Sequence, residues 1–182
     1  VNIENLIPFA TDDFSVSVWA KVASFANYGG IFNNRDSAGT DLGFQIRTMS
    51  ASDDVVLYLD FGASAGSVTQ VGLNTGQWYH IVSTVDRSGD MVLYIDGSVS
   101  DTDDISAQSA VNINNTATPR IGRSEGSSYF NGTVDEVMIF NRSLSAEEVV
   151  GLYANTSSKF LNYSLAVAEG THNLTAYAFD LM

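Results

Sequence analysis

The amino-acid sequence predicts an all-β protein in which two antiparallel sheets pack face to face as a β-sandwich, with one short helix near residues 146–153. Three observations support this fold class. Apolar and polar residues alternate with a period of two in a series of segments. Glycine- and asparagine-containing turns separate these segments. A helix N-terminal signature follows the last of them.

The first strand is expected at residues 14–22. Every second residue from Phe14 to Val22 is apolar, whereas Ser15 and Ser17 lie between them. Such alternation is typical of a strand with one buried and one solvent-exposed face. Similar runs define the other expected strands, which are residues 42–48, 55–61, 78–86, 91–96 and 133–141.

The run at 134–140 is apolar on both faces, which is expected of a strand inside a two-layer stack. Glycine and asparagine tolerate positive φ, so they mark the connections between strands. We expect turns at four places, namely Gly29-Gly30, Ser88-Gly89-Asp90, Asp96-Gly97 and Asn131-Gly132.

The helix is predicted from its start signals. Ser145 is placed as the N-cap, and Glu148 three residues later completes a capping box. Leu144 and Val149 have the spacing of a hydrophobic staple. A helix of about two turns cannot stand alone, so we expect it to cover one end or edge of the sandwich.

One domain is expected over residues 1–155, followed by a separate segment at 156–182. Two alternating runs, 160–167 and 173–179, predict a β-hairpin in this segment. The hairpin either completes the sandwich or begins a following module. Because the sequence starts at Val1 and stops directly after a strand-like run, we expect it to be part of a longer protein.

Composition excludes several classes of function. The chain has 182 residues, of which 45% are hydrophobic and none is Cys, so a disordered chain and a disulfide scaffold are excluded. No apolar run approaches the roughly 18 residues of a membrane span. The formal charge of −13 argues against nucleic acid and anionic lipid as partners. It is compatible with a solvated secreted surface, with calcium-binding carboxylates or with salt tolerance.

A set of short motifs, in a fixed order over about three quarters of the chain, resembles the laminin-G-like or concanavalin A-like jelly-roll family. The C-terminal hairpin is similar to strands of bacterial and archaeal immunoglobulin-like modules. The motifs that carry the first resemblance are Phe14-Ser15-Val16-Ser17-Val18-Trp19, Gly76-Gln77-Trp78-Tyr79-His80, Leu93-Tyr94-Ile95-Asp96-Gly97, Arg120-Ile121-Gly122 and Asn131-Gly132-Thr133-Val134-Asp135-Glu136.

The resemblance implies a jelly-roll β-sandwich that serves as a non-catalytic recognition or adhesion module of a multidomain secreted or cell-surface protein. Its partner would be a glycan or an extracellular protein, beside neighbouring domains of the same longer chain. Two alternatives stay open. One is a carbohydrate-active enzyme of the glycoside hydrolase type, and the other is a purely structural spacer. Fold analogy alone does not decide among them.

The resemblance also makes Asp135 a candidate ligand of a structural calcium ion. Asp135 and Glu136 point to opposite faces of a regular strand, so both face one ion only if a bulge intervenes. Asp36, Asp41 and Glu125 are further candidate ligands, for a weaker calcium site. A pentraxin-type double calcium site is not expected, because the loop at 123–127, which would hold its second acidic cluster, has lost most of the acids and contains Arg123. The alternative is that these carboxylates are solvated or accept hydrogen bonds.

Ligand-binding candidates lie in loops and at strand ends. A sugar site needs an aromatic face and a few amide or carboxylate groups. Asn33, Arg35, Asp36 and Tyr129 are predicted to supply these groups. The other loop aromatics, which either bind ligand or pack locally, are Phe25, Tyr28 and Phe130.

No catalytic constellation is recognisable in the sequence. Two G-x-S-x-G matches, at 62–66 and 122–126, precede no helix and have no histidine partner. The alternating acids of jelly-roll glycosidases are missing. Residues 101–104 begin like a calcium-binding EF-hand loop but lack its later ligands, so an exposed polar turn is expected. His80 is predicted to be a buried, hydrogen-bonded core residue.

An extracellular or cell-surface location is predicted from glycosylation sequons. An N-x-[ST] sequon marks a surface position in an exported protein. The sequon asparagines are Asn114, Asn131, Asn141, Asn155, Asn162 and Asn173.

Overall fold

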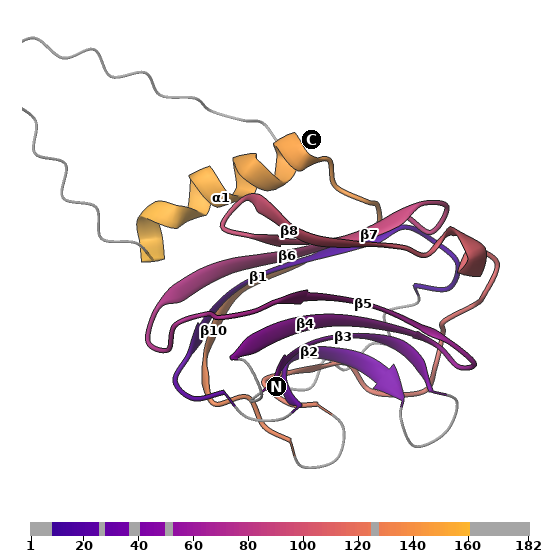
Figure 1. Ribbon diagram of the computed structural model, residues 1–182, viewed down its shortest axis with the longest axis horizontal. Coiled ribbons are helices and arrows are strands. Elements are labelled where there is room, and N and C mark those ends of the chain that lie inside the picture. The colour runs from indigo at the N-terminus through magenta and orange to yellow at the C-terminus, as the bar shows by residue number, and fades with distance from the viewer. Residues whose placement is uncertain (1–8, 26–27, 37–40, 50–52, 125–127, 161–182) are drawn as a thin grey trace, which may run out of the picture.

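The computed structural model describes residues 9–25, 28–36, 41–49, 53–124 and 128–160. Two five-stranded antiparallel sheets pack face to face (Figure 1), which confirms the predicted two-sheet sandwich. The predicted hairpin after residue 160 lies outside the described residues.

One sheet, called here the helix-covered sheet, has the order β10-β1-β6-β7-β8. The second, called the helix-free sheet, has the order β5-β4-β3-β2-β9. The strands of the helix-covered sheet are β1 (Phe14–Val22), β6 (Trp78–Val85), β7 (Asp90–Ile95), β8 (Ser98–Asp104) and β10 (Gly132–Phe140). Those of the helix-free sheet are β2 (Gly29–Asp36), β3 (Leu42–Met49), β4 (Asp54–Phe61), β5 (Ala65–Gln70) and β9 (Arg120–Ile121).

The main core fills the space between the sheets, as the alternation predicts. Phe14 of β1 meets Phe44 of β3 edge to face, with 5.1 Å between ring centroids. Val16 and Val18 on β1, and Leu57 on β4, are fully buried in the same cluster. Removal of this apolar surface from water is the main stabilising contribution to the sandwich.

Both faces of β1 are buried, so the prediction of a half-buried strand was wrong. Helix α1 (Ala146–Phe160) lies over the outer face of the helix-covered sheet (Figure 1). Beneath it, Ser15, Ser17 and Trp19 are all fully buried. The Trp19 indole donates a 2.8 Å hydrogen bond to the Thr156 hydroxyl. The outer face of β1 is therefore buried beneath α1 and forms part of the contact with the helix.

The helix begins as predicted and ends later. The Ser145 hydroxyl accepts the Glu148 N–H at 3.3 Å, and a Glu148 carboxylate oxygen accepts the Ser145 N–H at 2.9 Å, which confirms the capping box. The helix continues through the expected domain boundary at residue 155 and ends at Phe160 rather than at residue 153. Its later turns are stabilised by tertiary contacts that the start signals do not report. No helix among the described residues is long and apolar enough to cross a membrane.

His80 of β6 lies under the same helix. It is fully buried, its ring stacks on Tyr153 with 5.9 Å between centroids, and Nε2 lies 2.9 Å from the Ser17 hydroxyl. Nδ1 has no hydrogen-bond partner among the described residues. The predicted burial is confirmed, but only one of the two ring nitrogens is satisfied.

Two segments expected to be turns are strands. Gly29-Gly30 begins β2, and residues 101–104 belong to β8. Gly30 is required by close packing rather than by turn geometry, because a Cβ there would collide with the backbone of Arg123 and Ser124. Neither strand has the apolar alternation that sequence analysis relies on.

Strand β10 also differs from its prediction. It lies at the edge of the helix-covered sheet rather than inside the stack, and Asp135 and Ile139 are exposed. The register with β1 shifts between Ser17 and Trp19, and Glu136 has φ +47°. A bulge therefore interrupts the strand at this point, as bulges often do at sheet edges.

The two sheets are joined along one side by aspartate side chains. Asp101 accepts the Thr69 N–H at 2.9 Å, and Asp103 accepts the Ser67 N–H at 3.1 Å. The aspartates belong to β8, and the two donors lie on the free edge of β5. Carboxylates of the helix-covered sheet thus accept hydrogen bonds from the backbone N–H groups at the edge of the helix-free sheet.

At one end of the sandwich, a buried arginine holds several loops together. Arg87 follows β6 and is 2% exposed. Its guanidinium donates hydrogen bonds to the carbonyl oxygens of Ala10, Gln108 and Val111 at 2.7 to 3.0 Å. Two segments far apart in sequence, at Ala10 and at 108–111, are therefore bonded to one donor group.

Candidate binding site on the helix-free sheet

The outer face of the helix-free sheet carries charged and aromatic side chains in register. Arg35 on β2 lies opposite Gly43 on β3, which lies opposite Asp60 on β4. Successive residues of a strand point to opposite faces, so these positions share one face. Because Gly43 has no side chain, the long Arg35 side chain can reach across β3 to Asp60.

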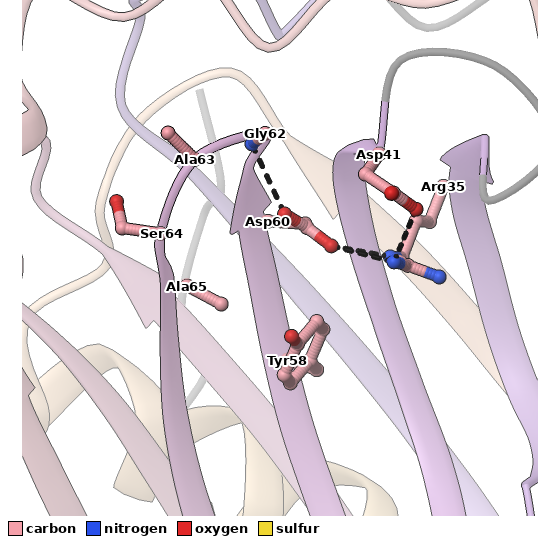
Figure 2. A pocket seen from close by; sticks show the side chains of 8 residues that line it. All are labelled: Arg35, Asp41, Tyr58, Asp60, Gly62, Ala63, Ser64 and Ala65. Atoms are coloured by element: carbon pink, nitrogen blue, oxygen red, sulfur yellow. Dashed lines mark hydrogen bonds and ion pairs between the residues drawn. The ribbon is translucent and has the colours of Figure 1, made fainter.

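An ion cluster forms where this face ends. Figure 2 shows the Arg35 guanidinium between the carboxylates of Asp41 and Asp60. Arg35 Nη2 lies 2.8 Å from Asp41 Oδ1 and 2.6 Å from Asp60 Oδ2, and Nε donates to Asp60 Oδ2 at 2.8 Å. The other oxygen of Asp60 accepts the Gly62 N–H at 3.0 Å. Asp60 is buried with both oxygens bonded, so it fixes the position of Arg35.

A hollow of about 300 Å³ opens beside this cluster. Its wall consists of the Arg35 cluster, the ring of Tyr58 and the β4–β5 turn (Figure 2). The volume lies at the lower end of the range for small-ligand sites. The residues that line the hollow are Arg35, Asp41, Tyr58, Asp60, Gly62, Ala63, Ser64 and Ala65.

The cluster offers donors and an acceptor close together. The Asp41 side chain is 53% exposed, and its Oδ1 is the oxygen bonded to Arg35. Guanidinium carries five N–H donors in a fixed plane, and Arg35 directs only Nε and Nη2 at the carboxylates. A donor next to an acceptor matches a pair of neighbouring hydroxyl groups, as sugars present. The arrangement can therefore bind and orient a polar ligand.

A second arginine lies further along the same face. The Arg47 guanidinium carbon is 4.8 Å from the ring centroid of Tyr28 and 4.8 Å from that of Tyr58. The Arg35 guanidinium carbon is 5.5 Å from the centroid of Tyr58. Burial lowers the pKa of the Arg47 guanidinium, with Tyr28 and Tyr58 opposing that effect and Arg35 adding to it. Cations and aromatic rings thus alternate along the face.

The predicted ligand residues do not form one site. Arg35 lies in the hollow, whereas Asn33 is fully buried and donates to the Arg35 carbonyl at 3.3 Å. Asp36 ends β2. Tyr129 is 62% exposed but bridges to Gly30 at the start of β2. Arg35 is five positions after Gly30 on the strand, so Tyr129 lies roughly 17 Å from the hollow.

The predicted calcium ligands are not gathered in the described residues. Asp135 is exposed, and its Oδ1 accepts the N–H of Glu136 at 2.8 Å. Asp41 is bonded to Arg35, and Glu125 lies outside the described residues. No group of three or more His, Asp or Glu side chains suited to a metal occurs in the part of the chain that the structure describes. Calcium takes six to eight oxygens, so these residues alone do not form such a site, and calcium binding stays a prediction.

Sequence reasoning missed Asp60, Tyr58 and Arg47. Asp60 and Tyr58 belong to the predicted strand at 55–61, where alternation showed that they face away from the core. That position was a usable signal. The pattern within one strand does not show that Asp60 on β4 pairs with Arg35 on β2, because the register of the strands is set by tertiary pairing.

The described residues hold no nucleophilic triad. Ser64 of the first G-x-S-x-G match lies in the β4–β5 turn and lines the hollow. His80, the one histidine within the described ranges, is buried under α1 in the other sheet. The motif therefore has neither the elbow nor the base that a serine hydrolase needs.

A family model described as the concanavalin A-like lectin/glucanases superfamily matches residues 1–150. No curated protein matches the chain. Similar solved structures include the receptor binding domain of botulinum neurotoxin D, with TM-score 0.66 and 20% identity over 86% of this chain and 41% of that chain.

Two further solved structures show the same fold. The binding domain of botulinum neurotoxin serotype G has TM-score 0.65 and 22% identity over 83% of this chain and 38% of that chain. The binding domain of Paraclostridial Mosquitocidal Protein 1 has TM-score 0.64 and 24% identity over 85% of this chain and 40% of that chain. The present chain thus spans about two fifths of the length of these proteins.

Proposed function

Because the chain belongs to the concanavalin A-like lectin/glucanases superfamily, we propose that it is a non-catalytic recognition module that binds a glycan on the outer face of its helix-free sheet. Membership in the superfamily supplies the fold. The choice of this face rests on the side chains and coverage of the two sheets.

The asymmetry of the two outer faces is the observation that carries the proposal. The outer face of the helix-covered sheet is occupied by α1, which buries Ser17, Trp19 and His80. The helix-free sheet instead ends in the hollow at Arg35, where charged groups are held by hydrogen bonds before any ligand arrives. Such preorganisation reduces the entropic cost of binding.

Solved structures with this fold support the class of partner. One concerns cell entry of botulinum neurotoxin type C, which depends on two ganglioside molecules. Another contains the binding domain of botulinum neurotoxin DC with rat synaptotagmin II. These proteins bind a glycolipid and a protein, respectively. The hydroxyl-matching groups at Arg35 and Asp41 favour the glycan for the present chain.

Catalysis by the same groups is disfavoured by their bonding. A glycosidase needs one carboxyl group as a proton donor and a second carboxylate across the sugar. Asp41 and Asp60 both accept hydrogen bonds or ion pairs from Arg35. Both carboxylates therefore contact the same cation rather than facing each other across a sugar-sized space. Turnover of an oligosaccharide by the pure chain would contradict the proposal and favour the enzymatic alternative.

A face-blocking variant tests the location of binding. Ser67 is exposed on β5 and lies opposite Tyr58. Ser67→Trp is expected to weaken binding at least about tenfold, because the indole covers the face beside the hollow. Binding would be measured on a glycan array and then by calorimetry with the bound glycans.

The matched control is Thr102→Trp, which places the same side chain at an exposed position of β8 in the other sheet. It should bind as the wild type does. Equal binding by wild type and Ser67→Trp would contradict the assignment of this face. A stable chain that binds no glycan at all would leave the spacer alternative in its place.

We further propose an extracellular or surface location beside other domains of a longer chain. Exposure of the sequon asparagines within the described residues supports this proposal, because glycosylation needs an accessible side chain. The exposed members are Asn114, Asn131, Asn141 and Asn155.

A structural calcium is a separate prediction. If Asp135 contributes to such a site, Asp135→Ala should remove any increase of the melting temperature by calcium, since a ligand bound only to the folded state stabilises it. Thr133→Ala, at an exposed position of the same strand, is the control. Thermal scans with calcium and with chelator measure the effect. Equal melting temperatures of wild type under both conditions would end the calcium hypothesis.

A further inference from the structure

Arg47 lies on the helix-free sheet and forms no ion pair with any acidic residue that the structure describes. Its guanidinium lies near the rings of Tyr28 and Tyr58, 4.8 Å from each ring centroid, and its Nε is buried with no hydrogen-bond partner. Asp54 is a diagonal neighbour on β4, but it forms no ion pair with Arg47 within the described residues. A desolvated cation without an anion destabilises a folded protein. Arg47 is therefore costly to the fold in this state.

The environment of Arg47 is suited to a planar anion. The residue is half-buried, and Nε is its one nitrogen that is enclosed without a bond. Two nearby rings restrict the guanidinium in a partly desolvated position, where a charged hydrogen bond is stronger than in water. Guanidinium donors form a fork that matches both oxygens of a carboxylate.

Half of the basic residues of the chain lie on or beside the helix-free sheet. The chain has eight Lys and Arg residues against 21 Asp and Glu. Four of the eight belong to β2, β3, β9 or the residues just after β9, namely Arg35, Arg47, Arg120 and Arg123. Arg120 lies opposite Asn33 in register, and the Arg123 guanidinium is 5.4 Å from the ring centroid of Tyr129.

We propose that Arg47, between Tyr28 and Tyr58, binds the carboxylate of an acidic sugar at the end of the glycan. This inference rests on the proposed function and names its ligand class. Tyr58 connects the two regions, because it lines the hollow and also contacts Arg47. A neighbouring sugar can then occupy the hollow at Arg35. A single carboxylate is compatible with the net charge of −13, which disfavours polyanions.

Matched saccharides separate carboxylate recognition from general glycan binding. The probes are 3′-sialyllactose, its methyl ester and lactose, with glucuronyl-glucose and cellobiose as a second pair for the uronic acids. The full chain is expected to bind at least one free acid about 10- to 100-fold more tightly than its neutral counterpart, which is the strength of a charge-assisted pair. Affinities would be measured by calorimetry at two salt concentrations.

Arg47→Met removes the charge and keeps an unbranched side chain of similar reach. We expect this variant to lose the preference for acids while its melting temperature stays equal to or above that of the wild type. Asp54→Asn is the control, and it should keep the preference. If Arg47 instead paired with Asp54 in solution, Arg47→Met would lower the melting temperature. Asp54→Asn would then increase the affinity for the acidic saccharide. Both results would contradict an Arg47 that has no anionic partner before the ligand binds.

The outcomes distinguish this inference from the proposed function. Equal affinity for acid and neutral saccharides, with binding still blocked by Ser67→Trp, overturns the role of Arg47 and leaves the glycan site in place. An acid preference that survives in Arg47→Met also overturns it. Failure of every saccharide to bind overturns both proposals.

Discussion

Replacing Arg87 with alanine is expected to lower the free energy of unfolding by about 3–5 kcal/mol. Its guanidinium is the donor to carbonyl oxygens of Ala10, Gln108 and Val111, and the residue is 2% exposed. Truncation leaves these acceptors without their donor and opens a cavity beside Phe61, whose ring centroid lies 5.3 Å from the guanidinium carbon. Both effects are costly in a buried position.

Urea unfolding followed by tryptophan fluorescence measures this loss. Arg87→Lys should recover part of it, because an ammonium group cannot reach all three carbonyls at once. Arg142→Ala is the control, since Arg142 forms an exposed pair with Glu148 and such pairs contribute little. A loss in Arg87→Ala no larger than in Arg142→Ala would show that the loops are held by other contacts.

Acid is expected to destabilise the contact between α1 and the sheet through His80. Burial lowers the pKa of His80 from its ordinary value of 6.5 to about 4. Between these two pH values the unfolded chain binds a proton that the folded chain does not, so stability falls as the pH is lowered through this window. The full loss is about 3 kcal/mol, because a charged imidazole would be enclosed between Ser17 and Tyr153.

The comparison of wild type with His80→Gln isolates this contribution. Burial also raises the pKa of Asp96, which acts in the opposite direction, and the variant leaves Asp96 in place. The wild type should lose more stability than His80→Gln between pH 6.5 and 4. In parallel, NMR titration of His172→Gln, which leaves a single imidazole, should give a pKa near 4. Parallel stability profiles together with a titration near 6.5 would contradict the assignment.

Much of the sandwich could be predicted because many of its strands place apolar residues regularly on the face toward the main core. The alternation at 14–22 defines β1 to the residue, and the run at 91–96 nearly matches β7. Four strands were missed, namely β2, β5, β8 and β9. In β2 and β8, residue types are set by contacts with other parts of the chain rather than by alternation. Gly30 accommodates the Ser124 backbone, and Asp101 binds the β5 edge. No local pattern encodes such needs.

The candidate site was predicted only in part for a similar reason. Arg35 was identified from its residue type near a strand end. Asp60 and Arg47 were not, since each acquires its role from a register that brings β2, β3 and β4 together. Tyr129 was expected at the same site but lies at the other end of β2. The sequence shows which residues have the right chemical groups for a site. Which of them come together depends on how the strands pair.

The carboxylates of Asp101 and Asp103 limit the pairing of the β5 edge with strands of other copies of this module. An open strand edge with free N–H groups recruits strands from other molecules and seeds fibres. On β5, the donors of Thr69 and Ser67 are already taken from within the same chain. An incoming strand would have to displace two charged acceptors. The sandwich can therefore be displayed densely, or repeated in tandem, without this edge seeding polymerisation.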